Sequence, residues 1–155
     1  MSTLEENKVI MQRYFDELMN KGDYSKADEI FHQDFVAIGA GGLKGIDGHK
    51  QYRDSVLSIV SDGHIEVQEI VAEEDKVVVF SEWSAIHDKG DFLGVPPTGK
   101  KVTFNMVGVY GFKDGKIIKG AVRTLSNQLP VFQQLGVLPS NEEFIRVYKE
   151  SHNLE

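Results

Sequence analysis

The stretch VTFNMVGVYGFKDGKIIKG, residues 102–120, contains the pattern that decides the fold. Two runs rich in β-branched and aromatic residues flank Asp114-Gly115, and an Asp-Gly pair supplies the positive φ that a tight hairpin turn requires. The return strand is expected from Ile117 to about Leu125. The run Val77–His87 has the same composition and is separated from the hairpin by a loop with two prolines. These runs predict a sheet of long antiparallel strands.

The segments before the sheet have helical patterns. Apolar residues spaced three and four apart over residues 10–18 predict a first helix, which ends at Asn20-Lys21-Gly22-Asp23. A short helix is expected over residues 24–31, an extended segment over 35–38, and a third helix after Asp47. A strand over residues 65–71 then opens the sheet.

Two more helices are expected at the C-terminal end, over residues 130–135 and 141–150, the second of them capped by Asn141. Helices first and hairpin-linked strands after them indicate an α+β fold. Because no repeat or shift in composition marks a boundary, we expect a single domain over residues 1–155, with a core of about 5–138.

Composition excludes several classes of function. The chain has 155 residues, 17 basic against 24 acidic, with a net charge of −7 and no cysteine. Such a chain is a poor ligand for nucleic acid or for an anionic membrane surface, because both need clustered Lys and Arg. It cannot form disulfides, thiol nucleophiles or thiolate metal sites. Because the N-terminus is acidic and no apolar run could span a bilayer, we expect a cytoplasmic protein.

Four pieces of the chain, in this order, carry a family resemblance. They are Asn20-Lys21-Gly22-Asp23, Asp75-Lys76-Val77-Val78-Val79, His87 followed by FLGVPPTGK over residues 92–100, and Gln133-Gln134-Leu135-Gly136. Together they resemble the SnoaL-like polyketide cyclases, also called ester cyclases, of the nuclear-transport-factor-2-like superfamily. The resemblance extends over most of the chain.

The resemblance implies a cone-shaped α+β fold, in which a curved, mostly antiparallel sheet wraps around the N-terminal helices and encloses a deep apolar cavity. It also implies a small organic molecule as the partner, ring closure by an intramolecular aldol reaction, and no metal or organic cofactor. Soluble homo-oligomers are typical of the family. We expect a homodimer, held together by an apolar sheet face or by the segment after Gln133.

His87 stands where the resemblance places a catalytic His, near an Asp that acts as the base. A neutral imidazole can polarise a carbonyl or accept a proton at cytoplasmic pH. The alternative is a strand-end His that is hydrogen-bonded to the loop after it.

The family's Asp falls on Asn127 when counted back from Gln133, and on Leu125 when counted forward from the hairpin turn. The first count is preferred, because it also places Arg123 at a position that is usually Trp or Arg in the family and keeps strand parity. An amide can hydrogen-bond but cannot act as a general base. Asn127 could instead form a turn, and Arg123 could bind an acidic ligand or lie on the outer face. Asp54 could supply the missing carboxylate.

The ligand-binding candidates are aromatic or apolar, and for each of them ordinary core packing is the alternative. On the sheet, Trp83 shares strand parity with His87, and the next strand contributes either Phe104 and Met106 or the opposite set that includes Val107. The expected ligand-binding residues are Trp83, Phe104, Met106, Tyr14, Phe35 and Tyr52. No metal is expected, because His32 and Asp34 lack a third ligand.

Three hypotheses about function follow. The first is a cofactor-independent cyclase or isomerase-type lyase that removes a proton next to a carbonyl, with His87, Arg123 and Asn127 as its catalytic groups. The second is a non-catalytic ligand-binding or carrier protein, since Asn127 appears where the family has its base. A weaker third hypothesis is a scaffold domain with a vestigial pocket.

Overall fold

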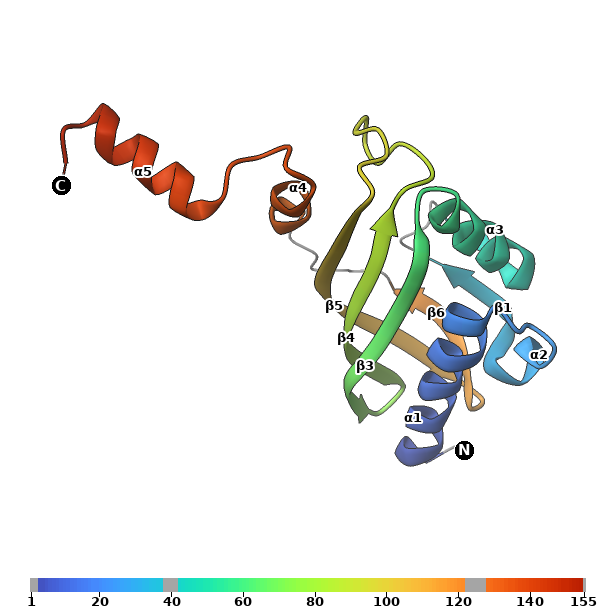
Figure 1. The fold of residues 1–155 in the computed structure, drawn as a ribbon. Coiled ribbons are helices and arrows are strands. Elements are labelled where there is room, and N and C mark those ends of the chain that lie inside the picture. The colour runs from blue at the N-terminus through green and yellow to red at the C-terminus, as the bar shows by residue number, and fades with distance from the viewer. Residues whose placement is uncertain (1–2, 38–41, 122–127, 155) are drawn as a thin grey trace.

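The computed structural model describes residues 3–37, 42–121 and 128–154 (Figure 1). Its elements, in chain order, are helix α1 (Leu4–Arg13), π-helix η1 (Tyr14–Lys21), α2 (Ala27–Ile30), β1 (Phe31–Ala37), β2 (Leu43–Lys44), α3 (Gly45–Leu57), β3 (Ser61–Glu73), β4 (Lys76–His87), β5 (Lys100–Lys113), β6 (Lys116–Ala121), α4 (Leu129–Leu135) and α5 (Asn141–Ser151). Leu125, where the return strand was expected to end, lies outside the described residues.

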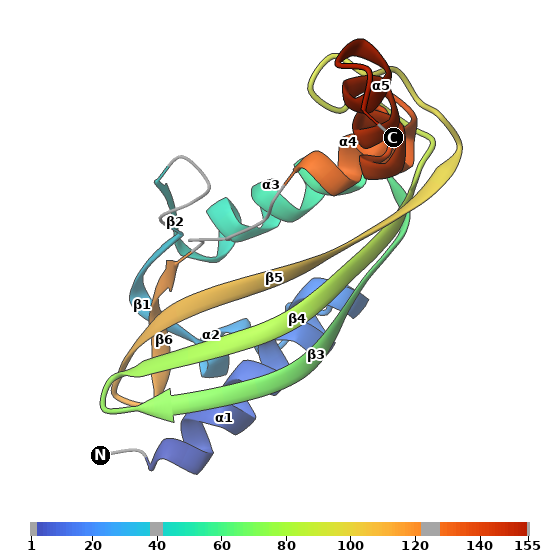
Figure 2. The same cartoon turned by 90° about the vertical axis from the view of Figure 1, so that its left-hand side faces the viewer.

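The strands form one curved sheet in the order β2-β1-β6-β5-β4-β3 (Figure 2). All neighbours are antiparallel except β1 and β6. The hairpin is confirmed: Lys113 pairs with Lys116, and Asp114 and Gly115 have φ values of 52° and 74°. Helix α1 packs against β3 and β4, whereas α3 packs against β1. The α+β fold, with a curved and mostly antiparallel sheet around N-terminal helices, is therefore as expected.

The core lies between the helices and the covered face of the sheet. It buries aromatic and aliphatic side chains from both layers, and burial of one such side chain contributes about 1.5–3 kcal/mol. The members with no exposed surface are Met11, Leu18, Ile30, Val77, Val79 and Ile117.

The first helix changes its winding partway along. The α-helical part ends at Arg13, and residues Tyr14–Lys21 form a π-helix, whereas the sequence spacing predicted an ordinary helix. The N–H of Gly22 bonds to the carbonyl of Glu17, and Gly22 has a φ of 70°. The Arg53 Nε donates to the Met19 carbonyl at 3.0 Å, and its guanidinium would lie only 2.9 Å from a Cβ on Gly22. Winding of this kind is often found beside functional sites.

Two local predictions were wrong. The helix expected over residues 24–31 is only the four residues of α2, because Phe31 already starts β1 and pairs with Ile117. Tertiary pairing overrides local propensity here. The last helix is capped by Ser140 rather than Asn141: the Ser140 hydroxyl accepts the N–H of Glu143, whose carboxylate accepts the N–H of Ser140. This capping box fixes the start of α5.

Two side-chain amides pair with backbone groups of the sheet, one on edge strand β3 and one on the internal strand β5. Asn20 donates to the carbonyl of Ile65 and accepts from its N–H, both at 2.8 Å, on edge strand β3. Gln134 of α4 makes the same double contact with Thr103 on β5, at 2.8 and 2.7 Å. In the described chain β5 pairs with β6 only from Val109 onward, so Gln134 occupies the side of β5 that has no strand neighbour.

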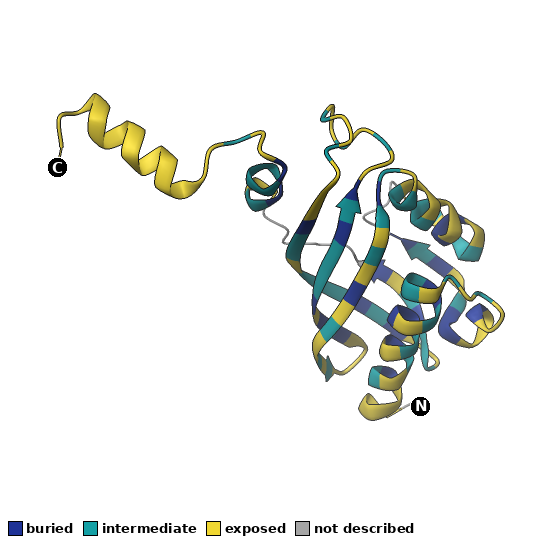
Figure 3. Cartoon of the chain, viewed as in Figure 1, coloured by how far each residue is buried: buried dark blue, intermediate teal, exposed yellow. Residues whose placement is uncertain are grey.

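Helix α5 extends away from the sheet, and none of its residues is buried (Figures 1 and 3). Its exposed apolar side chains are Phe144, Ile145, Val147 and Tyr148. Among the described helices, none is long and apolar enough to cross a membrane.

Removing the Gln134 amide tests whether it holds α4 on the sheet. We expect Gln134→Ala to lower the free energy of unfolding by about 1–3 kcal/mol, because it leaves the backbone groups of Thr103 without these partners. Gln133→Ala is the matched control, since the neighbouring Gln133 bonds only to exposed groups of the α4–α5 connection. Urea unfolding measures both. Equal losses in the two variants would contradict this role for Gln134.

Candidate ligand cavity

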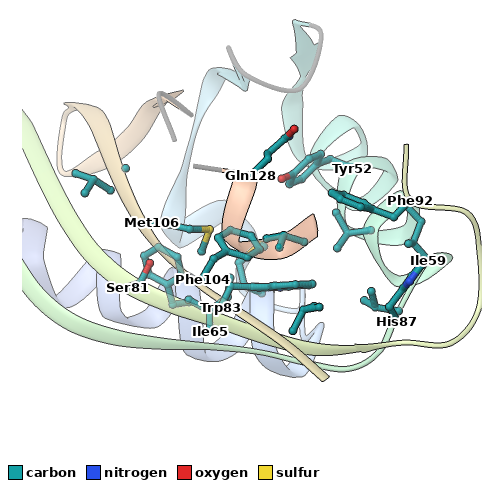
Figure 4. A pocket seen from close by; sticks show the side chains of 18 of the residues that line it. Tyr52, Ile59, Ile65, Ser81, Trp83, His87, Phe92, Phe104, Met106 and Gln128 are labelled. Atoms are coloured by element: carbon teal, nitrogen blue, oxygen red, sulfur yellow. The ribbon is translucent and has the colours of Figure 1, made fainter. Parts of the chain in front are cut away.

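A cavity of about 270 Å³ lies between the concave face of the sheet and helices η1, α3 and α4. Its walls are mostly apolar, as is usual for sites that bind small organic molecules. Figure 4 shows Trp83, Phe104 and Met106 on the sheet side, with Tyr52 across from them on α3. The polar side chains in its lining are Tyr14, Tyr52, Ser81, His87, Tyr110 and Gln128.

Strand parity on β5 selects between the two sets of residues that could line the cavity. Phe104 and Met106 line it, together with Val102 and Tyr110 of the same parity. Val107, from the opposite set, also contributes to the lining. On β4 the corresponding residues are Ser81, Trp83 and His87.

Aromatic rings form one wall of the cavity. The Trp83 and Phe104 rings lie opposite each other on paired strands, with centroids 5.0 Å apart. Phe92, from the proline loop, lies 6.0 Å from Phe132 of α4 and 6.3 Å from His87. A flat ligand could therefore stack against these rings.

His87 is almost completely buried and lies at the loop end of the cavity. Its Nε2 lies 2.9 Å from the Gly90 carbonyl, which can only accept, so Nε2 carries the proton. In the neutral ring Nδ1 is then the acceptor, 3.3 Å from the Thr98 hydroxyl. The expected hydrogen bonds to the following loop are present, and the ring also borders the cavity.

A second buried histidine, His49, lies behind the cavity wall. Its Nε2 is 3.0 Å from the hydroxyl of Tyr14, and its Nδ1 is 2.7 Å from the hydroxyl of Tyr24. Burial, assisted by the positive charge of Arg53, lowers the pKa of His49 to about 4, so the ring is neutral near pH 7. One nitrogen therefore donates and the other accepts.

Three tyrosines, Tyr14, Tyr52 and Tyr110, lie in the lining of the cavity. Burial raises the pKa of Tyr14, Tyr52 and Tyr110, so all three remain protonated near neutral pH. The rings of Tyr14 and Tyr110 lie next to each other, with centroids 5.7 Å apart. Gly108 makes room for Tyr110: a Cβ at Gly108 would lie 2.8 Å from the Tyr110 ring.

Five of the six predicted ligand-binding residues line the cavity. Phe35 does not: it is buried against Phe31, with ring centroids 4.1 Å apart, and near His49. It belongs to β1, whose covered face packs into the core rather than onto the cavity. Conversely, His49 carried no recognised sequence signal, although its spacing to Tyr52 and Val56 places all three on one face of α3.

Two of the three predicted catalytic residues, Arg123 and Asn127, lie outside the described residues. Asp54 is exposed on α3 and does not line the cavity. In the described part of the chain the cavity lining contains no carboxylate and no Lys or Arg. Within the same residues, no three side chains of the metal-ligating types come together.

The curved six-stranded sheet and the helices that pack against its concave face place the protein in the nuclear-transport-factor-2-like class. A family model described as SnoaL-like polyketide cyclase matches residues 9–135. The chain belongs to this family. No curated protein sequence matches the chain.

Solved structures with the same fold include three bacterial proteins. TsrD from Streptomyces laurentii is 22% identical with a TM-score of 0.75, over 89% of this chain and 100% of that one. AclR from Streptomyces galilaeus, described as a candidate hydroxylase, is 28% identical with a TM-score of 0.70, over 88% and 100%. A candidate SnoaL-like polyketide cyclase from Jannaschia sp. CCS1 is 25% identical with a TM-score of 0.72, over 90% and 98%.

Burial of a neutral His49 makes stability depend on pH. The unfolded ring titrates near 6.5 and the folded ring near 4, so the unfolded state binds more protons between these values. Stability is therefore full above about pH 6.5 and falls as the pH drops toward 4, by roughly 3 kcal/mol. Urea unfolding across this window should show less of the loss in His49→Gln than in the wild type.

The matched control is His64→Gln, since His64 is exposed on β3. The free energy of unfolding of His64→Gln should fall between about pH 6.5 and 4 by the same amount as that of the wild type. The pH dependence assigned to His49 is wrong if His49→Gln and the wild type lose stability equally.

Proposed function

We propose that the protein binds a small, mostly apolar carbonyl compound and catalyses a cyclase-type reaction by removing a proton next to the carbonyl. Aldol-type ring closure is the favoured outcome, without a cofactor. The observation that carries the proposal is the apolar cavity with a buried imidazole at one end. Membership of the SnoaL-like polyketide cyclase family supports it.

His87 is the proposed base or enolate-stabilising group. The bond from Nε2 to Gly90 fixes the tautomer, which leaves the lone pair of Nδ1 for proton transfer. The contact of Nδ1 with Thr98 is long, at 3.3 Å, so a ligand can replace it at small cost. Arg123 and Asn127 are proposed as polar contacts to the ligand.

The second candidate is ligand binding without turnover. It is favoured by the lack of a carboxylate among the described residues that line the cavity, and by the engagement of both ring nitrogens of His87 with the loop. Without a competent base the reaction loses the rate acceleration of about 10²–10⁴-fold that general acid–base catalysis supplies. Binding of the ligand does not depend on that base.

We also propose that the protein forms a homodimer in the cytoplasm. The exposed apolar stripe of α5, residues 144–148, and the exposed ring of Phe80 on β4 are the surfaces that support association. Apolar side chains gathered on one surface are typical of interaction sites.

Exchange of carbon-bound hydrogen tests the catalytic proposal without knowledge of the natural substrate. The probe is 2-tetralone, a two-ring ketone with acidic hydrogens next to its carbonyl, followed by NMR in D₂O. The wild type should accelerate the exchange, and His87→Gln should slow it by about 10²-fold or more. Gln was chosen because its amide can still donate to the Gly90 carbonyl.

The control variant is His64→Gln, which should exchange the probe like the wild type. Binding is followed separately through Trp83, the single tryptophan of the chain and part of the cavity wall. Quenching of Trp83 without any acceleration of exchange would support the second candidate. Equal exchange by the wild type and His87→Gln would remove His87 from the mechanism.

The dimer proposal predicts that α5 contributes to association. Sedimentation should give a dimer at micromolar concentration, and the double variant Ile145→Ser/Tyr148→Ser should shift it toward monomer. Both side chains are more than half exposed, so the substitutions remove apolar surface without opening the core. A wild type that sediments as a monomer would contradict the proposal.

A further inference from the structure

Tyr14, His49 and Tyr24 form a hydrogen-bonded chain that the proposed reaction does not use. It begins at the half-buried Tyr24 beside α2, passes through the buried imidazole of His49 on α3, and ends at Tyr14 on η1. Tyr14 is the only one of these three that lines the cavity. Among the described residues, every buried side-chain polar atom has a hydrogen-bond partner. The hydrogen-bonded chain of Tyr24, His49 and Tyr14 is therefore complete in the structure.

The direction of hydrogen bonding along this chain has two possible settings. A neutral imidazole donates from one nitrogen and accepts at the other. If Tyr24 donates to Nδ1, then Nε2–H donates to the oxygen of Tyr14, and the hydroxyl hydrogen of Tyr14 is free for another acceptor. In the opposite setting the Tyr14 hydroxyl donates to Nε2. Only a lone pair of the Tyr14 oxygen then faces the cavity, and this can accept a hydrogen bond from a ligand but cannot donate one.

We propose that Tyr14 is the hydrogen-bond donor for a negatively polarised oxygen of the bound ligand, and that His49 and Tyr24 are positioning residues that hold the Tyr14 hydrogen toward the cavity. The inference rests on the proposed function and adds the group that binds the carbonyl or enolate oxygen. Tyr110 is also in the lining, and its ring lies 5.7 Å from that of Tyr14, so it stands near the same oxygen position.

The physical basis is that a donor in a dry cavity is effective only if its own oxygen is supplied with a hydrogen bond. Donation from Nε2–H to the Tyr14 oxygen polarises the O–H and strengthens its hydrogen bond to a ligand. The cavity offers no Lys or Arg among its described residues, so phenol hydroxyls are the donors suited to an oxyanion. Burial raises the pKa of Tyr14, which keeps its hydrogen in place when an anion binds.

The first test measures the affinity for 4-nitrophenolate under mildly alkaline conditions by quenching of Trp83. The phenolate oxygen stands in for the enolate oxygen, and 4-nitrotoluene is the matched probe that lacks it. Tyr14→Phe should weaken binding of 4-nitrophenolate by about 10–100-fold, the range for a hydrogen bond to a charged group. Binding of 4-nitrotoluene should not change. Tyr148→Phe, on exposed α5, is the control variant.

The second test reads the tautomer of His49 directly by ¹⁵N NMR of the histidine ring. In the complex with 4-nitrophenolate, Nε2 should carry the hydrogen and Nδ1 should not. A hydrogen on Nδ1 of His49 in that complex would overturn the inference, whatever the affinities.

The outcomes separate this inference from the function on which it rests. A wild type that binds neither probe contradicts both. A wild type that binds 4-nitrophenolate as tightly as Tyr14→Phe does contradicts only the role of Tyr14. Equal weakening of both probes in Tyr14→Phe would show a general packing defect and would also overturn the inference.

Discussion

The cavity depends on how the open edges of the sheet are closed. A strand without a neighbour exposes backbone N–H and C=O groups, which must find other partners when side chains cover them. Here Asn20 supplies a donor and an acceptor to one residue of edge strand β3, in the way that a neighbouring strand would. Gln134 does the same for Thr103 in the part of β5 that has no strand neighbour among the described residues. The two amides hold η1 and α4 against the sheet, and both helices contribute side chains to the lining of the cavity. Both amides lie within motifs that carried the family resemblance.

Local chemistry predicted the sheet well. The Asp114-Gly115 turn was predicted correctly because few other residue pairs accept those backbone angles, although the register of β5 and β6 shifts by one residue beyond Phe112. The prediction of a helix over residues 24–31 was wrong because the outcome depends on a distant contact and not on local chemistry. Phe31 pairs with Ile117, which is remote in sequence. The π-winding of η1 also has no local signal, since the spacing of its apolar residues suits an ordinary helix.

The site was less predictable than the fold, because its members meet only in three dimensions. Parity placed Trp83 and His87 on one face of β4, but which face of β5 bordered the cavity was settled only by the pairing of Trp83 with Phe104. Phe35 was misplaced because an aromatic residue in the core and one at a cavity look the same in sequence. His49 was overlooked because its role comes from Tyr14 and Tyr24, which lie 35 and 25 residues away.

The π-winding of η1 couples the two ends of that helix. Tyr14 faces the cavity at its start and Asn20 faces β3 near its end. A π-helix turns through a smaller angle per residue than an α-helix, so these two directions are compatible only with the wider coil. At this spacing the tighter α-helical coil would rotate one of the two side chains away from its partner, whereas an α-helix one residue shorter would bring both back to nearly the same directions. The wider coil therefore lets this segment carry one residue more than an α-helix would need to reach both the ligand's surroundings and the rim of the sheet.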